Sequence, residues 1–61
     1  MIFLLADVGG TNARLALARD GVIDRATISR FRGDDHASFD EVVSLFLEQQ
    51  GNPGIDAVCV D

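Results

Sequence analysis

Apolar and polar residues alternate in short blocks over the first half of the chain, a pattern that predicts strands separated by tight turns. Residues 1–7 form an apolar run that ends in an aspartate, which is typical of a strand inside a sheet that is covered on both faces. After a glycine turn the pattern alternates, with Leu15 and Leu17 on one face, and Asp20-Gly21 then favours a two-residue hairpin. A three-stranded antiparallel meander is therefore predicted.

The third strand and a helix complete this pattern. Residues 22–31 are predicted as the third strand, with Ile23, Ala26, Ile28 and Phe31 as its apolar positions. From residue 38 the period changes to that of a helix, since Ser38 and Glu41 favour a capping box and Gly51 suits the left-handed position after the last turn. The helix presents one apolar stripe, made of Phe39, Val42, Val43, Phe46 and Leu47.

Residues 55–60 are predicted as a fourth strand, and the segment from Val58 to Val60 has the composition of a strand buried on both faces. A helical crossover usually returns the next strand parallel to a neighbour in the same sheet. The predicted fold class is therefore α/β, a three-stranded meander followed by a helix and a fourth strand. Because one helix covers one face, we expect the chain to be the opening piece of a longer protein or to bury the other face by self-association.

Composition excludes some functions. The 61 residues are enough for one small domain of marginal stability. Ten acidic residues against five basic ones give a net charge of -5, which disfavours a nucleic-acid partner. The first six residues are too short for a signal peptide or a membrane span, and Cys59 is interpreted as a small buried residue of a reducing compartment. We expect a cytoplasmic protein that does not bind membranes.

The candidate chemistry lies in the turn after the first strand. Gly9 and Gly10 leave several backbone N–H groups without side chains in front of them, which suits an anion. Asp7 has two interpretations: a turn aspartate that accepts hydrogen bonds from the glycines, or a ligand of Mg²⁺, which would keep the carboxylate from repelling phosphate. The turn is neither a P-loop nor a dinucleotide fingerprint, because it lacks the P-loop lysine and leads into a strand.

Residues 5–17, LADVGGTNARLAL, resemble the phosphate-1 segment at the N-terminus of bacterial glucokinases, a branch of the sugar kinase, Hsp70 and actin superfamily. The pattern Asp-x-Gly-Gly-Thr-Asn-x-Arg carries the resemblance, and Asn12 distinguishes it from the related repressor branch, which usually has lysine there. Weaker similarity extends over all 61 residues. The resemblance implies a ribonuclease H-like fold of the actin-like ATPases, with residues 1–61 as the N-terminal part of the small α/β domain, incomplete on its own.

The resemblance further implies ATP and Mg²⁺ as cofactors, glucose as the phosphoryl acceptor, and a parent enzyme that forms homo-oligomers. It places the sugar-binding residues and the catalytic base beyond residue 61, so we expect the chain alone to have no kinase activity. The alternative is a non-catalytic nucleotide-binding or phosphate-binding module, or a self-associating fragment. The implied ATP-contacting residues are Ala6, Asp7, Val8, Gly9, Gly10 and Thr11, with Asn12 and Arg14 as further candidates and Asp7 as the metal ligand through water.

Arg14 and Asn12 each have a second interpretation. Arg14 could contact phosphate, but pairing with Asp7 or another carboxylate is favoured, and Asn12 could serve turn geometry instead of a ligand.

Two charged groups lie outside the motif. His36 with Asp34 and Asp35 suggests a metal cluster, but three adjacent loop residues favour a solvated loop. The arginines of the third strand, Arg25, Arg30 and Arg32, suggest a partner surface, but the exposed face of an edge strand is favoured.

Overall fold

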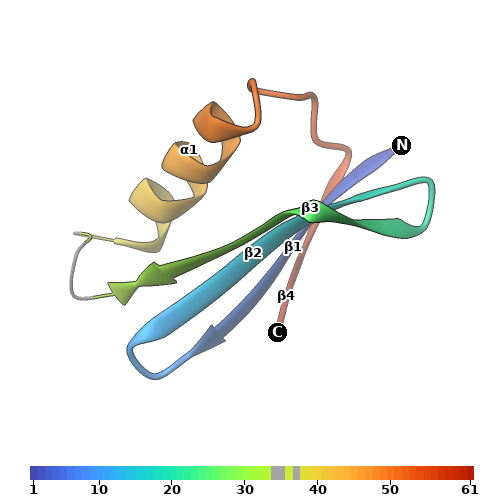
Figure 1. Ribbon diagram of the computed structural model, residues 1–61. Helices are drawn as coiled ribbons and strands as arrows, with labels where there is room; N and C mark the ends of the chain where they lie inside the picture. Colours follow the sequence, from blue (N-terminus) through green and yellow to red (C-terminus); the bar gives the residue numbers. More distant parts are fainter. Residues whose placement is uncertain (34–35, 37) are drawn as a thin grey trace.

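The computed structural model describes residues 1–33, 36 and 38–61 and consists of one sheet with one helix on it (Figure 1). The elements follow in the order β1 (Ile2–Gly9), β2 (Asn12–Arg19), β3 (Val22–Arg32), α1 (Phe39–Gln49) and β4 (Ala57–Val60). The strands lie in the order β3-β2-β1-β4, with β1 antiparallel to β2 and parallel to β4. The predicted α/β architecture, a meander followed by a helix and a parallel fourth strand, is confirmed.

Both hairpins of the meander close through two residues. Asp20 and Gly21 join β2 to β3 with φ values of 52° and 85°, and two successive positive φ values are characteristic of a type I′ turn. Gly10 and Thr11 join β1 to β2, and of these two only Gly10 has a positive φ, 50°, as in a type II′ turn. The predicted hairpin at Asp20-Gly21 is therefore confirmed.

Helix α1 begins and ends as the sequence predicts. The Oγ of Ser38 accepts a hydrogen bond from the backbone N–H of Glu41 at 3.2 Å. At the other end Gly51 has φ 83° and donates to the carbonyl of Glu48 at 3.1 Å, and Asn52 donates to the carbonyl of Leu47 at 2.8 Å. These two bonds form a Schellman motif, which satisfies carbonyls that the last turn leaves without helical partners.

The core lies between α1 and one face of the sheet. Side chains alternate between the two faces of a strand, so residues of even number on β1 and of odd number on β2 point toward the helix. Phe46 is fully buried and its ring packs edge-on against Phe31, with 6.4 Å between the ring centroids. The buried cluster is made of Leu4, Ala6, Ala13, Leu15, Leu17, Phe31, Val42 and Phe46.

Strand β3 carries an irregularity that breaks its alternation. Between Leu17, which faces Asp24, and Leu15, which faces Ser29, the register shifts. Thr27 lies in this segment and is buried; its hydroxyl accepts a hydrogen bond from the N–H of Leu17 at 2.9 Å and donates one to the carbonyl of Asp24 at 2.6 Å. The polar hydroxyl thus satisfies backbone groups that the shifted ladder leaves unpaired.

The other apolar positions of β3 are exposed. Of the four positions that define this strand in the sequence, Phe31 is buried, whereas Ile23 and Ile28 are about half exposed and Ala26 is exposed. Ile23 faces Ala18 in the ladder and so lies on the side of the sheet away from α1. The helix covers one face, as predicted, and the described residues place no second layer on the other.

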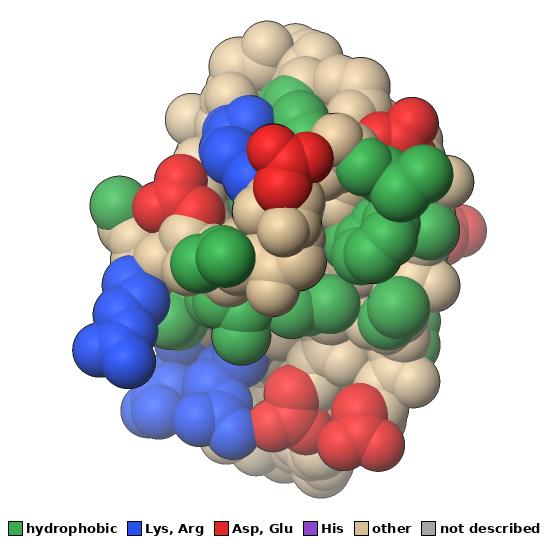
Figure 2. Space-filling model, turned by 90° about the vertical axis from the view of Figure 1, so that its right-hand side faces the viewer, with side chains coloured by type: hydrophobic (Ala, Val, Ile, Leu, Met, Phe, Trp, Pro, Cys, Tyr) green, Lys and Arg blue, Asp and Glu red, His purple; other side chains and the backbone are tan. Residues whose placement is uncertain are grey.

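Strand β4 is shorter and more exposed than predicted. It spans Ala57–Val60, all four residues are exposed, and no residue of β4 belongs to the core cluster in the described part of the chain. The prediction of a strand buried on both faces is therefore wrong, and so is that of a buried Cys59, which is exposed. The physical reason is position, because β4 pairs with β1 on one side and forms the edge of the sheet on the other. The face of the molecule drawn in Figure 2 carries a band of exposed hydrophobic side chains.

Helix packing onto the sheet is expected to dominate the stability of the chain. Phe46→Ala should destabilise the fold by about 3–5 kcal/mol, much of the roughly 3–9 kcal/mol expected for a chain of this size. Phe39→Ala, at a position that is 36% exposed, should cost less than half of the Phe46→Ala loss. Urea unfolding followed by circular dichroism measures both, and equal losses would contradict the core that we describe.

Candidate functional site

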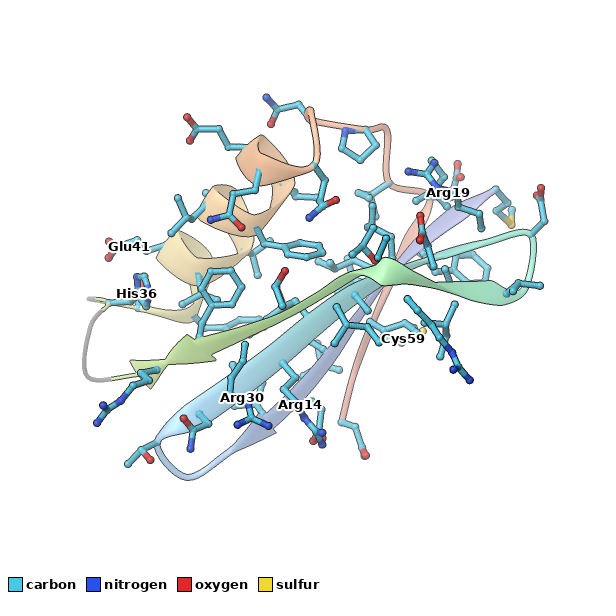
Figure 3. The ribbon with its side chains drawn as sticks, in the orientation of Figure 1. Arg14, Arg19, Arg30, His36, Glu41 and Cys59 are labelled. Atoms are coloured by element: carbon cyan, nitrogen blue, oxygen red, sulfur yellow. The ribbon has the colours of Figure 1, made fainter. Side chains whose placement is uncertain are left out.

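Three strands bring charged side chains into one row on the face away from the helix. Asp7 of β1 faces Arg14 of β2, and Arg14 in turn faces Arg30 of β3. Because Ala6 and Leu15 point toward α1, their neighbours Asp7 and Arg14 point to the opposite side. Figure 3 shows Arg14 and Arg30 on the side of the sheet away from the helix. The row therefore lies outside the core, beside the β1–β2 turn.

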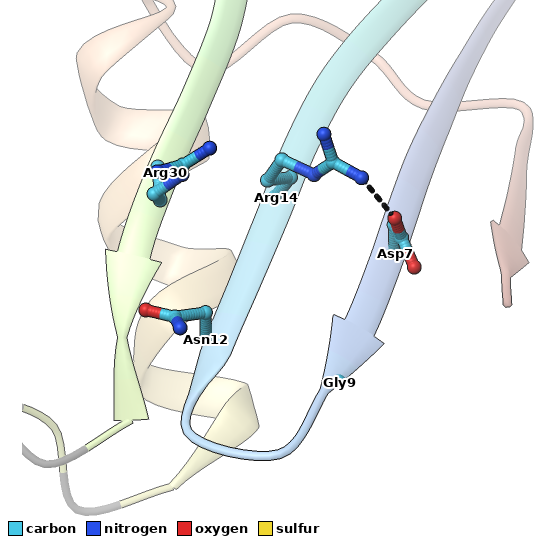
Figure 4. Close-up of a pocket in the computed structure, with 5 residues that line it drawn as sticks. All are labelled: Asp7, Gly9, Asn12, Arg14 and Arg30. Carbon is cyan, nitrogen blue, oxygen red and sulfur yellow. Dashed lines mark hydrogen bonds and ion pairs between the residues drawn. The ribbon is translucent and has the colours of Figure 1, made fainter.

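Asp7 and Arg14 form an ion pair. The Nη2 of Arg14 donates to the Oδ2 of Asp7 at 2.6 Å (Figure 4). This is the pairing that the sequence favoured for Arg14. The side chains are 56% and 53% exposed, and exposed pairs of this kind contribute only about 0–1 kcal/mol. Both groups thus remain available to a ligand at low cost to the fold.

The row lines an open hollow next to the turn. Its volume is about 280 Å³, and its lining consists of Asp7, Gly9, Asn12, Arg14 and Arg30. Two guanidinium groups and one carboxylate give this lining a local excess of positive charge in a chain of net charge -5. An arginine presents a planar fork of N–H donors that matches phosphate oxygens. The hollow is therefore chemically suited to an anion.

Glycine occupies the end of β1 although the fold does not require it there. The φ of Gly9 lies outside the left-handed region, and a Cβ added to it would meet no atom within 4 Å. Gly10 differs, because its φ of +50° is a conformation that residues with a Cβ rarely adopt. Gly10 is thus explained by the turn, whereas Gly9 leaves open space on the lining of the hollow.

The predicted site residues divide between two faces. Asp7, Gly9, Asn12 and Arg14 share the hollow described above. A second hollow, on the side of α1, includes Val8, Gly10, Thr11 and Asn12 together with Phe31, Gly33, His36, Ser38, Phe39 and Val42. Ala6 is buried in the core, so its side chain supports the fold and faces neither hollow. Asn12 lies on both, and its Nδ2 is 3.5 Å from the Oγ1 of Thr11.

His36 is packed instead of solvated, contrary to the interpretation from sequence. Its side chain is 15% exposed, its ring lies edge-on to Phe31 with 5.7 Å between centroids, and its Nδ1 is 3.8 Å from the Oε1 of Glu41. Asp34 and Asp35, which the sequence places beside it, lie outside the described residues.

Asp7 is the carboxylate available to a metal ion in the hollow beside the turn. Among the described residues no group of three or more histidine, cysteine, aspartate or glutamate side chains could hold a metal. Mg²⁺ often keeps several waters and binds through one or two carboxylates plus substrate phosphates. One exposed carboxylate beside a hollow with two arginines is compatible with that mode of binding. The role of Asp7 as a metal ligand stays a prediction.

Arg30 lines the hollow beside the turn, but the sequence analysis did not assign it to the phosphate site. Arg19 faces Val22 and Leu17 faces Asp24, and continuing that count would place Thr27 opposite Arg14. The irregularity in β3 shifts the register so that Arg30 takes this position instead. The hairpin signal at Asp20-Gly21 fixes the register near the turn but carries no information about a shift farther along the strand.

The described part of the chain contains no helix that is long and apolar enough to cross a membrane.

Comparison with known proteins gives the family. The family model described as glucokinase matches residues 4–60. The glucokinase of Marinobacter nauticus is 35% identical over 57 residues, which are 93% of this chain and 18% of that protein. The glucokinase of Photorhabdus laumondii is 45% identical over 49 residues, 77% of this chain and 15% of that protein. The glucokinase of Klebsiella pneumoniae strain 342 is 48% identical over 48 residues, which are 75% of this chain and 14% of that protein. These matches cover most of this chain but less than a fifth of each relative's length. The chain belongs to the glucokinase family.

Proposed function

We propose that residues 1–61 form the N-terminal part of the small α/β domain of an ATP-dependent glucose kinase, and that the β1–β2 hairpin holds the phosphates of Mg-ATP. The observation that carries the proposal is the hollow beside the turn, where Asp7, Arg14 and Arg30 stand in one row next to Gly9. Membership of the glucokinase family supports ATP as the anion and glucose as the acceptor. The parent enzyme would form glucose 6-phosphate and ADP in the cytoplasm.

Each group of the hairpin has a defined task in this proposal. Mg²⁺, when bound with ATP, offsets charge on the phosphates, and the Asp7 carboxylate would hold it through water. The backbone N–H groups around Gly9 would donate to phosphate oxygens from the hollow. Gly10 and Thr11 line the hollow on the side of α1, so the N–H of Gly10 and the hydroxyl of Thr11 would reach the phosphates around the tip of the turn. The empty space at Gly9 supports this arrangement, since a ligand could approach the backbone there without meeting a side chain.

The hairpin supplies binding and not the whole reaction. Phosphoryl transfer depends on positioning the nucleophile, the metal and the phosphate together. The resemblance assigns the sugar site and the base to segments beyond residue 61, and the chain spans about 14–18% of the length of the relatives compared above. We therefore propose that activity requires the remainder of a glucokinase.

A chimaera tests the proposed function. Residues 1–61 replace the matching N-terminal segment of the Marinobacter nauticus glucokinase, and a coupled assay follows glucose-dependent release of ADP. We expect the chimaera to turn over ATP within about tenfold of the parent, which corresponds to about 1.4 kcal/mol of barrier, while the 61-residue chain alone stays at background. A folded chimaera without activity would refute the proposal.

Asp7→Asn separates the role in metal binding from a role in stability. In the chimaera this change should lower turnover by roughly 10–100-fold, the usual loss for a group that holds a metal ion through an intervening ligand such as water. The free energy of unfolding should change by less than about 1 kcal/mol, because the ion pair with Arg14 is half exposed. Glu48→Gln removes an exposed carboxylate on α1 and serves as the control. Unchanged turnover in Asp7→Asn would remove Asp7 from the metal site.

Gly9→Val tests whether phosphate approaches the backbone. We expect the KM for Mg-ATP to rise by about tenfold or more, which corresponds to about 1.4 kcal/mol or more of lost binding, with the fold retained, because the added side chain meets open space within the chain. Gly54→Val, also in open space without a positive φ, is the control away from the hairpin. Gly10 is less suitable because its φ of +50° would add backbone strain. A normal KM in Gly9→Val would show that the ligand does not reach this strand end.

A further inference from the structure

We propose that Arg30 is a second phosphate-binding arginine of this hairpin, an inference that rests on the proposed function and adds a residue to it. The register places Arg30 directly opposite Arg14, and both line the hollow that Asp7 and Gly9 also line. Figure 4 shows the two arginines on adjacent strands on the same face. The polyphosphate of the nucleotide would lie over β1, β2 and β3 instead of over the β1–β2 turn alone.

The two arginines form an arrangement that a sheet does not favour by itself. Like charges directly opposite each other on neighbouring strands are destabilising. Arg14 is neutralised by Asp7, but within the described residues Arg30 has no ion-pair partner. The positive charge of Arg30 therefore stands next to a second guanidinium, beside an open hollow. An anion bound between them would relieve the repulsion that the register creates.

The surroundings of Arg14 and Arg30 would become more positive if a metal ion bound at Asp7. The Asp7 carboxylate that now accepts a hydrogen bond from Arg14 at 2.6 Å is also the proposed ligand of the metal. A cation at Asp7 would weaken the hold of that carboxylate on Arg14, so both guanidiniums would then face the phosphates. The chemistry that fits is a compact group with several negative oxygens, such as a triphosphate, because each guanidinium fork can donate two bonds to it.

An exposed arginine on an edge strand can also serve only to prevent pairing with another chain. Arg25 provides the comparison, because it lies on the same strand, is exposed and does not line the hollow. A role in edge protection or in overall charge predicts equal effects of changing Arg25 and Arg30. A role in phosphate binding predicts an effect of Arg30 alone.

The test measures binding of Mg²⁺-tripolyphosphate to the 61-residue chain by calorimetry, with variants Arg30→Gln, Arg30→Lys and Arg25→Gln. We expect Arg30→Gln to weaken binding by roughly tenfold or more, the effect of losing one charge-assisted contact. Arg30→Lys should recover part of the loss, since it restores the charge but not the fork, and Arg25→Gln should stay within about twofold of the unchanged chain, a difference of about 0.4 kcal/mol.

The chimaera with the Marinobacter nauticus glucokinase gives a second readout in a complete enzyme. Arg30→Gln should raise the KM for Mg-ATP by the same factor and leave kcat within about twofold, as expected when binding is lost equally from substrate and transition state. Equal effects of Arg30→Gln and Arg25→Gln, or a loss of kcat without a change of KM, would overturn the role of Arg30. If Gly9→Val weakens binding and Arg30→Gln does not, the proposed function stands and this inference fails. If the unchanged chain and the chimaera bind no polyphosphate, both fail.

Discussion

The pairing of β1 with β2 is the constraint on which the rest of the structure depends. The two-residue turn at Gly10 and Thr11 sets Ala6 opposite Leu15 and Asp7 opposite Arg14. Because side chains alternate, a slip of one residue would exchange the faces of a strand and would bring Asp7 beneath helix α1. The same register thus decides which residues form the core and which face the hollow. The β1–β2 hairpin therefore determines both the core on one face of the sheet and the charged row on the other.

Packing of helix α1 on the apolar face of the sheet stabilises the fold. Val42 and Phe46 of α1 bury the apolar face of β1 and β2, and burial of such side chains supplies about 1.5–3 kcal/mol each. The opposite face keeps exposed charges, whose ion pair adds little to the fold. The exposed charged residues Asp7, Arg14 and Arg30 on that face can change without removing contacts of the core cluster. A small chain with one covered face can therefore carry a binding surface that its stability does not rest on.

Local features of the fold could be predicted, and features set by distant contacts could not. The turn at Asp20 and Gly21, the cap at Ser38 and the glycine at position 51 each act within a few residues, and the sequence shows them directly. The exposure of Cys59 depends on β4 being the edge of the sheet, which no local pattern records. The place of Arg30 depends on the register shift in β3, where Thr27 takes up the hydrogen bonds. The motif around Asp7 could be found from sequence, but the arginine that stands two strands away could not.

An acidic chain can still favour a compact polyanion. Charges separated by more than about 8–10 Å are largely screened at physiological ionic strength, so a small ligand in the hollow is affected chiefly by Asp7, Arg14 and Arg30. A long nucleic acid would instead lie against much of the surface and meet the net charge of -5. The composition and the site are therefore not in conflict. The overall charge opposes an extended polyanion, while the row of side chains across β1, β2 and β3 provides the local positive charge that a short one would need.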